Sequence, residues 1–357
     1  MYMNDNKELE NTMKDIFDYT LSDLEVYLEE KGMKKFRAKQ LYSWLYKKRV
    51  NSFDEMSDLA KDFRSLLEDE FTITSLKEVE KQVASDGTVK YLFELSDGHL
   101  IETVLMNNEY GKSVCVTSQV GCAMGCKFCA SGLLIKQRSL TTAEMVSQVL
   151  YVQKDLDKLN DRVRNLVIMG IGEPFDNYDN VLKFLEIINS DLGLEIGSRR
   201  ITISTCGIAP KIREFADGNY QYNLAISLHA PNDEIRNKIM PINKVYPLKE
   251  LLSALDYYSE KSNRRITFEY ILLKGVNDNA ECANQLADIV KGRNAYVNLI
   301  PYNSVDEADF KSSSDKDSLK FYDMLMRRNT HATLRAKHGD DIEAACGQLR
   351  AQKEGKR

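Results

Sequence analysis

Three cysteines, Cys122, Cys126 and Cys129, lie within eight residues in the spacing C-x-x-x-C-x-x-C. Thiolates are soft ligands that suit iron–sulfur clusters, and Gly121 and Gly125 let the backbone turn tightly enough for the sulfurs to converge. A 4Fe-4S cubane bound by three cysteines keeps one iron open, and that iron can bind S-adenosylmethionine. One electron passed to the sulfonium would release a 5′-deoxyadenosyl radical, which removes unactivated hydrogen atoms. The spacing therefore predicts radical chemistry.

A structural zinc site is the main alternative interpretation of these cysteines. Zinc usually has four closed ligands, often from two C-x-x-C pairs, and the sequence has no second pair. Seven cysteines in 357 residues, without a secretion signal, favour reduced thiols with chemical duties over a disulfide framework. We interpret Cys206 and Cys282 as small core residues.

Bulk composition is that of a folded protein, with 43% hydrophobic and 29% charged residues. No apolar run is long enough to span a bilayer, and the first residues lack the pattern of a signal peptide, so we expect a cytoplasmic protein without a membrane partner. The formal net charge of -5 does not indicate nucleic-acid binding, which would need a local basic surface.

Elements that could position the cysteines follow from hydrophobic periodicity. Residues 1 to about 72 look helical, and residues 81–106 alternate as strands around turn signals at 85–87 and 96–98. Six β-branched or apolar runs then alternate with helical stretches, which predicts βα units, a parallel sheet and polar residues gathered at its carboxyl-terminal edge. We predict an α/β fold, a partial (β/α)6 barrel with a small N-terminal helical domain and a connecting β-hairpin. The six runs are residues 114–119, 166–172, 201–207, 223–230, 266–275 and 297–303.

One basic segment stands out in the helical part, between Met33 and Val50. Leu41, Trp44 and Leu45 share one helical face there. The segment also carries seven basic and no acidic side chains, so that it is either a phosphate-binding surface or a solvated helix face. The basic residues are Lys34, Lys35, Arg37, Lys39, Lys47, Lys48 and Arg49.

Four segments together resemble the RlmN family of radical S-adenosylmethionine RNA adenine methyltransferases, in order and spacing and over nearly the whole chain. They are the cluster loop SQVGCAMGCKFCASG, MGIGEPF from Met169, ISLHAPND from Ile226 and HGDDIEAACGQLR from His338. The resemblance implies methylation of carbon 2 of adenosine 2503 in 23S ribosomal RNA and of adenosine 37 in transfer RNAs. It also divides the chain into an RNA-binding helical domain (1–72), a hairpin connector (73–110), a radical SAM barrel (111–340) and a C-terminal segment (341–357).

The family's chemistry proceeds through protein sulfur, because carbon 2 of adenine is too electron-poor to attack a sulfonium methyl. The resemblance implies that Cys346 accepts a methyl from one S-adenosylmethionine, and that a radical from a second molecule activates this methyl for addition to the base. Cys115 then helps to remove the ring proton and closes a disulfide with Cys346. The residues alone leave both roles open, since a lone thiol is more often inert and strand alternation cannot tell which way Cys115 points.

The resemblance also assigns cofactor contacts and one further catalytic position. Gly172 and Glu173 match the family's contact to the methionine amino group, and Glu102 matches a position treated as a proton acceptor. The remaining contacts to S-adenosylmethionine fall on Ser204, Ser227, Leu228, His229 and Asn303.

An RNA substrate favours the interpretation of the basic segment as a phosphate-binding surface over that of a solvated helix face. The basic residues Arg350, Lys353, Lys356 and Arg357 form a second candidate group. We expect a monomer that receives electrons from a flavodoxin or a ferredoxin. Two alternatives remain. A Cfr-type enzyme would methylate carbon 8 of the same ribosomal adenosine, although Pro174 and the ISLHAPND wording favour carbon 2. A non-catalytic RNA-binding protein would keep the cluster for structure.

Overall fold

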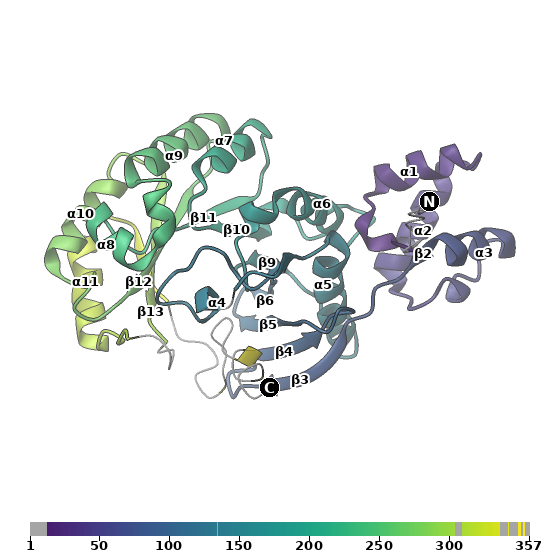
Figure 1. Cartoon of the computed structure of the whole chain (residues 1–357), viewed down its shortest axis with the longest axis horizontal. Helices are drawn as coiled ribbons and strands as arrows, with labels where there is room; N and C mark the ends of the chain where they lie inside the picture. The colour runs from purple at the N-terminus through teal and green to yellow at the C-terminus, as the bar shows by residue number, and fades with distance from the viewer. Residues whose placement is uncertain are drawn as a thin grey trace, which may run out of the picture.

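A single ten-stranded sheet organises the chain, in the order β14-β13-β12-β11-β10-β9-β6-β5-β4-β3 (Figure 1). The computed structural model describes residues 13–133, 135–303, 309–335, 342, 349–350 and 353. Within that part of the chain the outermost strands β14 and β3 do not pair with each other, so the barrel is partial. No helix of the described part is both long enough and apolar enough to cross a bilayer.

Parallel strands make up the larger part of the sheet. All six predicted runs form strands there, and a seventh, β14, adds to the edge beside β13. The three-residue run of β14 is too short to show a period in the sequence. The strands are β6 (Gly111–Cys115), β9 (Asn165–Ile168), β10 (Ile201–Thr205), β11 (Asn223–Ser227), β12 (Ile266–Leu272), β13 (Ala295–Pro301) and β14 (Ala332–Leu334).

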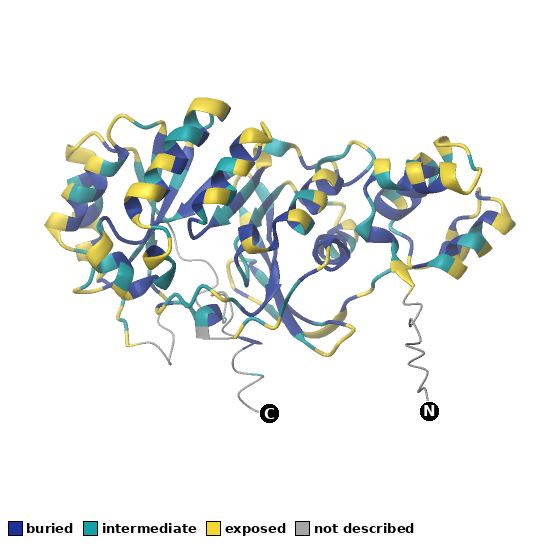
Figure 2. Ribbon diagram, turned by 45° about the horizontal axis from the view of Figure 1, so that its top comes forward, coloured by how far each residue is buried: buried dark blue, intermediate teal, exposed yellow. Residues whose placement is uncertain are grey.

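Helices follow the parallel strands and cover the outer face of the sheet (Figure 1). Their buried sides and the strands form one continuous core, visible as the dark blue inner surfaces in Figure 2. They are α5 (Thr142–Asp157), α6 (Tyr178–Asn189), α7 (Ala209–Asp217), α8 (Asp233–Ile239), α9 (Leu248–Ser262), α10 (Ala280–Val290) and α11 (Asp315–Arg327), with short 3-10 turns η4 (Pro174–Asn177), η5 (Ser198–Arg200) and η6 (Pro241–Lys244).

The predicted hairpin is present and continues into the barrel. Strands β3 (Lys77–Val83), β4 (Val89–Glu94) and β5 (Leu100–Asn108) pair antiparallel, and β5 pairs antiparallel with β6. Both predicted turns contain glycine at positive φ, +80° at Gly87 and +83° at Gly98, as tight turns require. The connecting strands therefore extend the sheet that carries the site.

The N-terminal unit is mostly helical and lies at one end of the molecule, next to α5 and α6 (Figure 1). Leu41, Trp44 and Leu45 are buried in it, which confirms the predicted apolar face. Asp18 joins the unit to the barrel, because its carboxylate accepts the Ala143 N–H at the start of α5 at 2.7 Å. The elements are β1 (Lys14–Asp15), η1 (Ile16–Asp18), α1 (Leu21–Glu30), α2 (Phe36–Tyr42), the π-helix η2 (Ser43–Lys48), η3 (Phe53–Glu55), α3 (Lys61–Glu70) and β2 (Phe71–Thr72).

Candidate active site

The loop that carries the three cysteines is closed at its base by a two-stranded ribbon. Strand β7 (Gln119–Val120) pairs with β8 (Arg138–Ser139), and a short helix, α4 (Ala130–Leu133), lies between them. Asn177 crosses this base, where its amide donates hydrogen bonds to the carbonyls of Ser118 and Leu140 at 2.9 and 2.8 Å. Both ends of the loop are therefore fixed to the barrel.

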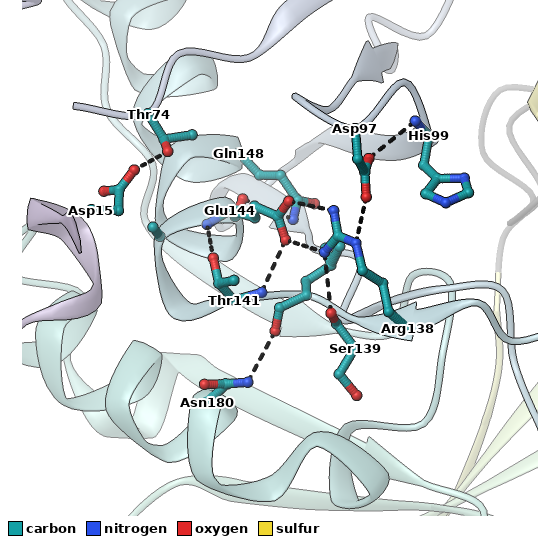
Figure 3. Close-up of polar contacts among 12 residues, drawn as sticks. Asp15, Thr74, Asp97, His99, Arg138, Ser139, Thr141, Glu144, Gln148 and Asn180 are labelled. Carbon is teal, nitrogen blue, oxygen red and sulfur yellow. Dashed lines mark hydrogen bonds and ion pairs between the residues drawn. The ribbon is translucent and has the colours of Figure 1, made fainter. Parts of the chain in front are cut away.

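Arg138 ties the loop to two further elements (Figure 3). Its guanidinium makes two hydrogen bonds of 2.7 Å to Glu144, and its Nε donates to Asp97 at 2.6 Å. Glu144 also accepts the Thr141 N–H as part of the capping box of α5, and Asp97 lies in the β4–β5 turn. The hydrogen bonds that Arg138 donates to Glu144 raise the pKa of Arg138 above its usual value. One side chain thus connects the loop, a helix start and the antiparallel edge.

We expect Arg138→Met to lower the free energy of unfolding by about 2 kcal/mol, because it leaves two carboxylates without their shared cation. Arg138→Lys should recover part of this, since it restores the charge without the two-pronged geometry. Urea denaturation measures the change. Lys238→Met is the control, because the ion pair of Lys238 with Glu234 on α8 is largely exposed. A loss below about 0.5 kcal/mol for Arg138→Met would contradict this role.

A cavity of about 270 Å³ opens where the cluster loop faces the inner side of the sheet. The three cysteine side chains are half-buried and line it. Gly172 has φ +110°, and a Cβ there would lie 2.6 Å from the side chain of Gln119, so only glycine fits at this wall. The lining also includes Gly170, Glu173, Ser204, Ser227, His229, Glu269 and Arg335.

The thiols fit a cluster better than a single metal ion. Among the described residues, no group of three or more His, Cys, Asp or Glu side chains is placed to hold one metal ion. A cubane does not require that, because each cysteine binds a different iron. Burial raises the pKa of Cys122 to about 12 and also raises the pKa of Cys126. Cys122, Cys126 and Cys129 would hold the cluster.

Glu173 directly follows Gly172, the glycine in the cavity wall, and it is 3% exposed. Its two oxygens accept hydrogen bonds from the N–H groups of Phe175 and Cys206 at 2.9 and 2.7 Å. Burial raises its pKa despite these donors. No ion pair joins Glu173 to a described side chain, so a ligand ammonium would provide a positive charge for this buried carboxylate.

His229 lies just after β11 with φ +54° and is 6% exposed. Its Nδ1 accepts the Ile271 N–H at 3.1 Å, which leaves the proton of the neutral ring on Nε2. Burial lowers its pKa to about 3, so the ring stays neutral at physiological pH. His229 can therefore donate one hydrogen bond from Nε2 and does not act as a cation.

Sequence reasoning missed a second buried carboxylate in the cavity, Glu269 on β12. Asn298 on β13 donates to it at 2.8 Å, and burial raises its pKa to about 7. The sequence signal for Glu269 was its position as the one acidic residue in the apolar run 266–275. Such a residue looks like a solvent-facing position of an amphipathic strand. Because helices cover the outer face of this sheet, the inner face lines a cavity instead.

The raised pKa of Glu269 predicts that Glu269→Gln increases the free energy of unfolding, by an amount that depends on pH. The folded pKa of about 7 lies above the ordinary 4.5, so ionisation opposes folding as pH rises through this window. The variant should be more stable than the parent by about 3 kcal/mol at pH 8 and by less than about 1 kcal/mol at pH 5. Urea denaturation of parent and variant at both pH values measures the difference in stability. A difference that does not change with pH would contradict the raised pKa.

Four of the sequence-predicted site residues that the structure describes do not line this cavity. Leu228 is fully buried, and Asn303 follows β13 with an exposed side chain. Cys115 and Glu102 are buried on β6 and β5. Cys346 lies outside the described residues. Cys206 and Cys282 are core residues as predicted, although Cys206 also touches the cavity.

Several charges of the basic segment already have protein partners. Lys35 pairs with Glu29 at 3.0 Å, Lys47 with Glu195 at 2.6 Å and Arg49 with Asp157 at 2.7 Å. In the expected second basic group, Arg350 is not a surface residue, because it is 3% exposed, and Lys353 pairs with Glu80, while Lys356 and Arg357 lie outside the described residues. Several of these basic side chains thus form ion pairs with acidic residues of the same chain, and composition alone could not reveal these pairs.

Comparisons with known proteins agree with this site. Residues 116–285 match the radical SAM superfamily, and residues 14–73 match the ribosomal RNA large subunit methyltransferase N-terminal domain. A solved radical SAM methyltransferase from Sphaerobacter thermophilus superposes with a TM-score of 0.90 at 41% identity, over 95% of this chain and 99% of that one. The fold and the three-cysteine loop therefore define a radical S-adenosylmethionine enzyme, with a 4Fe-4S cluster and S-adenosylmethionine as cofactors.

Curated relatives narrow the class to one family. A probable dual-specificity RNA methyltransferase RlmN from Enterococcus faecalis is 56% identical over 342 residues, which cover 94% of this chain and 96% of that protein. A protein of the same name from Staphylococcus aureus is 54% identical over 348 residues, 97% of this chain and 96% of its own length. The chain belongs to the RlmN family.

Proposed function

We propose that this enzyme methylates carbon 2 of an adenosine in ribosomal RNA and transfer RNA, adenosine 2503 and adenosine 37 in the family's terms, with Cys346 as the methyl carrier. The observation that carries the proposal is one cavity that joins the three cysteines to Glu173, Ser204 and His229. The names of the curated relatives, dual-specificity RNA methyltransferases, support RNA as the substrate.

A 4Fe-4S cluster held by Cys122, Cys126 and Cys129 would supply, together with S-adenosylmethionine, the hydrogen-abstracting radical chemistry that polar side chains cannot. The chain's own residues bind and orient. The carboxylate of Glu173 would receive the ammonium of the cofactor, and the hydroxyls of Ser204 and Ser227, 3.5 Å apart, present two polar groups on the same wall. His229 adds an Nε2–H donor.

Two thiols carry the remaining chemistry in this proposal. Cys346 Sγ holds the methyl carbon that becomes bonded to the base, and Cys115 takes the proton from carbon 2. The bond between the Cys346 sulfur and that carbon then breaks as the two sulfurs join. Its electron pair stays with the carbon, which takes up the proton to become the methyl group, and the unpaired electron of the adduct would leave to the electron carrier. Each turnover therefore leaves a disulfide that two electrons must reduce. We propose a flavodoxin or a ferredoxin as the electron source, a monomeric enzyme, and the cytoplasm, where its RNA substrates are made.

Nucleoside mass spectrometry tests the proposal. RNA from cells that make the protein should contain 2-methyladenosine, and RNA from cells that make Cys126→Ala should not, because that variant loses a proposed cluster ligand. If the product is 8-methyladenosine, the enzyme is of the Cfr type. If anaerobic incubation with dithionite and S-adenosylmethionine gives neither 5′-deoxyadenosine nor methylated RNA, the protein is a binding module and the proposal is wrong.

A further inference from the structure

Three described residues of the C-terminal segment, Leu349, Arg350 and Lys353, lie against the antiparallel edge of the sheet. Leu349 is 1% exposed and packs with Leu92 of β4 and Leu100 of β5, in a cluster separate from the main core. Lys353 pairs with Glu80 of β3 at 2.6 Å. An apolar contact and an ion pair four residues apart thus hold this segment on strands β3 to β5.

Between these two contacts, the backbone of the segment meets a buried ion pair. Lys90 of β4 and Glu102 of β5 are 3.0 Å apart, and their side chains are 0% and 3% exposed. The other oxygen of Glu102 accepts the N–H of Arg350 at 2.7 Å. Glu102 therefore bridges an ammonium of the sheet and the main chain of the C-terminal segment, and each interaction compensates part of the cost of burying a charge.

The register of the sheet places this bridge on the same face as Cys115. Lys90 is paired with Val104, and Val104 with Cys115. Paired residues point to one face, and so do residues two apart on a strand, so that Glu102 and Val104 share it too. Lys90, Glu102 and Cys115 therefore point to a common side of the sheet.

Chain length limits how far Cys346 can lie from this anchor. It precedes Arg350 by four residues, a length of chain that spans at most about 14 Å when fully extended. Fixing the Arg350 N–H raises the effective concentration of the Cys346 thiol near the face that carries Cys115. The two thiols of the proposed reaction must meet to form their disulfide, so this anchor would favour that encounter.

We propose that Lys90 and Glu102 are positioning residues for the methyl-carrying thiol. Lys90 holds the Glu102 carboxylate, and this carboxylate holds the backbone that leads to Cys346. The family resemblance implies that Glu102 accepts a proton, but both of its oxygens already accept hydrogen bonds from the protein. This inference rests on the proposed function in one respect, that Cys346 carries the methyl.

The decisive variant is Lys90→Met combined with Glu102→Gln. It removes both charges of this pair together, so that neither Lys90 nor Glu102 stays charged without the other, and the Gln carbonyl can still accept the Arg350 N–H. Glu102→Ala removes the acceptor. Lys77→Met is the matched control, because Lys77 also forms a cross-strand ion pair in this sheet, with Glu94 between β3 and β4, but is 72% exposed.

Two readouts on the reconstituted full-length enzyme need neither RNA nor methyl transfer. Hydrogen exchange of peptides covering residues 343–357 should become about tenfold faster or more in Glu102→Ala, and change by less than about threefold in the double variant and the control. The ratio of Cys115–Cys346 disulfide to dithiol, measured by mass spectrometry in a fixed glutathione buffer, should fall about tenfold in Glu102→Ala alone.

Two results would overturn the positioning role. One is unchanged exchange and disulfide content in Glu102→Ala. The other is a double variant that keeps the exchange protection but loses more than about 100-fold in 2-methyladenosine formation, because that loss would mark Glu102 as a group that moves a proton. Parent enzyme that shows the expected exchange and disulfide behaviour but makes no methylated RNA would contradict the proposed function and support the anchor.

Discussion

Replacement of Cys115 by alanine is expected to trap the RNA on the protein as a covalent adduct. In the proposed reaction the bond from Cys346 to the base breaks only when Cys115 removes the ring proton and joins the disulfide. Without that thiol, formation of 2-methyladenosine should fall by about 100-fold or more. Cys346→Ala should prevent both the adduct and the product. Denaturing gels with labelled RNA and mass spectrometry of the digested adduct measure both outcomes.

Cys282→Ala is the matched control for these two variants. Like Cys115, this thiol is buried, 2% exposed on α10, but unlike Cys115 it belongs to the main core. Turnover by Cys282→Ala should stay within about threefold of the parent, and the variant should lose only packing stability. If the Cys346 variant forms an adduct, or the Cys115 variant turns over at the parent rate, the assigned thiol roles are wrong.

The sequence predicts the parallel part of the sheet because its strands are continuous β-branched or apolar runs separated by helices. It does not predict β14, whose three residues are too few to show a period. Nor does it predict that η2 (Ser43–Lys48) continues α2 as a π-helix, because both kinds of helix bury nearly the same spacing of apolar residues. Strand register is a tertiary property, so the common face of Glu102 and Cys115 emerges only from the pairing.

The same distinction applies to the site: some of its residues can be predicted from the local sequence, and others only from the tertiary structure. The cysteine loop is predictable because cluster binding requires several ligands at short spacing. Lys90 and Glu269 are not, because each is one charged residue within an apolar run and looks like a solvent-facing strand position. Their burial depends on what covers each face of the sheet, which no local pattern records. Glu173 is attributable to the cofactor only through family resemblance, and its partners come from distant elements.

Glu173→Gln is expected to weaken binding of S-adenosylmethionine by about 100-fold, close to 3 kcal/mol. The carboxylate is already oriented by the N–H groups of Phe175 and Cys206, so the loss reflects its charge more than its position. Burial raises its pKa, so protonation of Glu173 should compete with the ammonium of the ligand at a higher pH than at an exposed carboxylate. Affinity should fall as pH is lowered in the parent and change little with pH in the variant.

Anaerobic titration calorimetry of the reconstituted enzyme at two pH values measures this effect. Asp176→Asn is the control, because Asp176 lies three residues away and pairs with Lys136 outside the cavity. It should change the affinity by less than about threefold, as expected for a partly exposed pair. The neutral amide of the Glu173 variant keeps the shape of the wall, so an unchanged affinity would show that the cofactor's ammonium binds elsewhere. A parent affinity that rises as pH falls would contradict the linkage, because protonation of Glu173 can only compete with the ligand's positive charge.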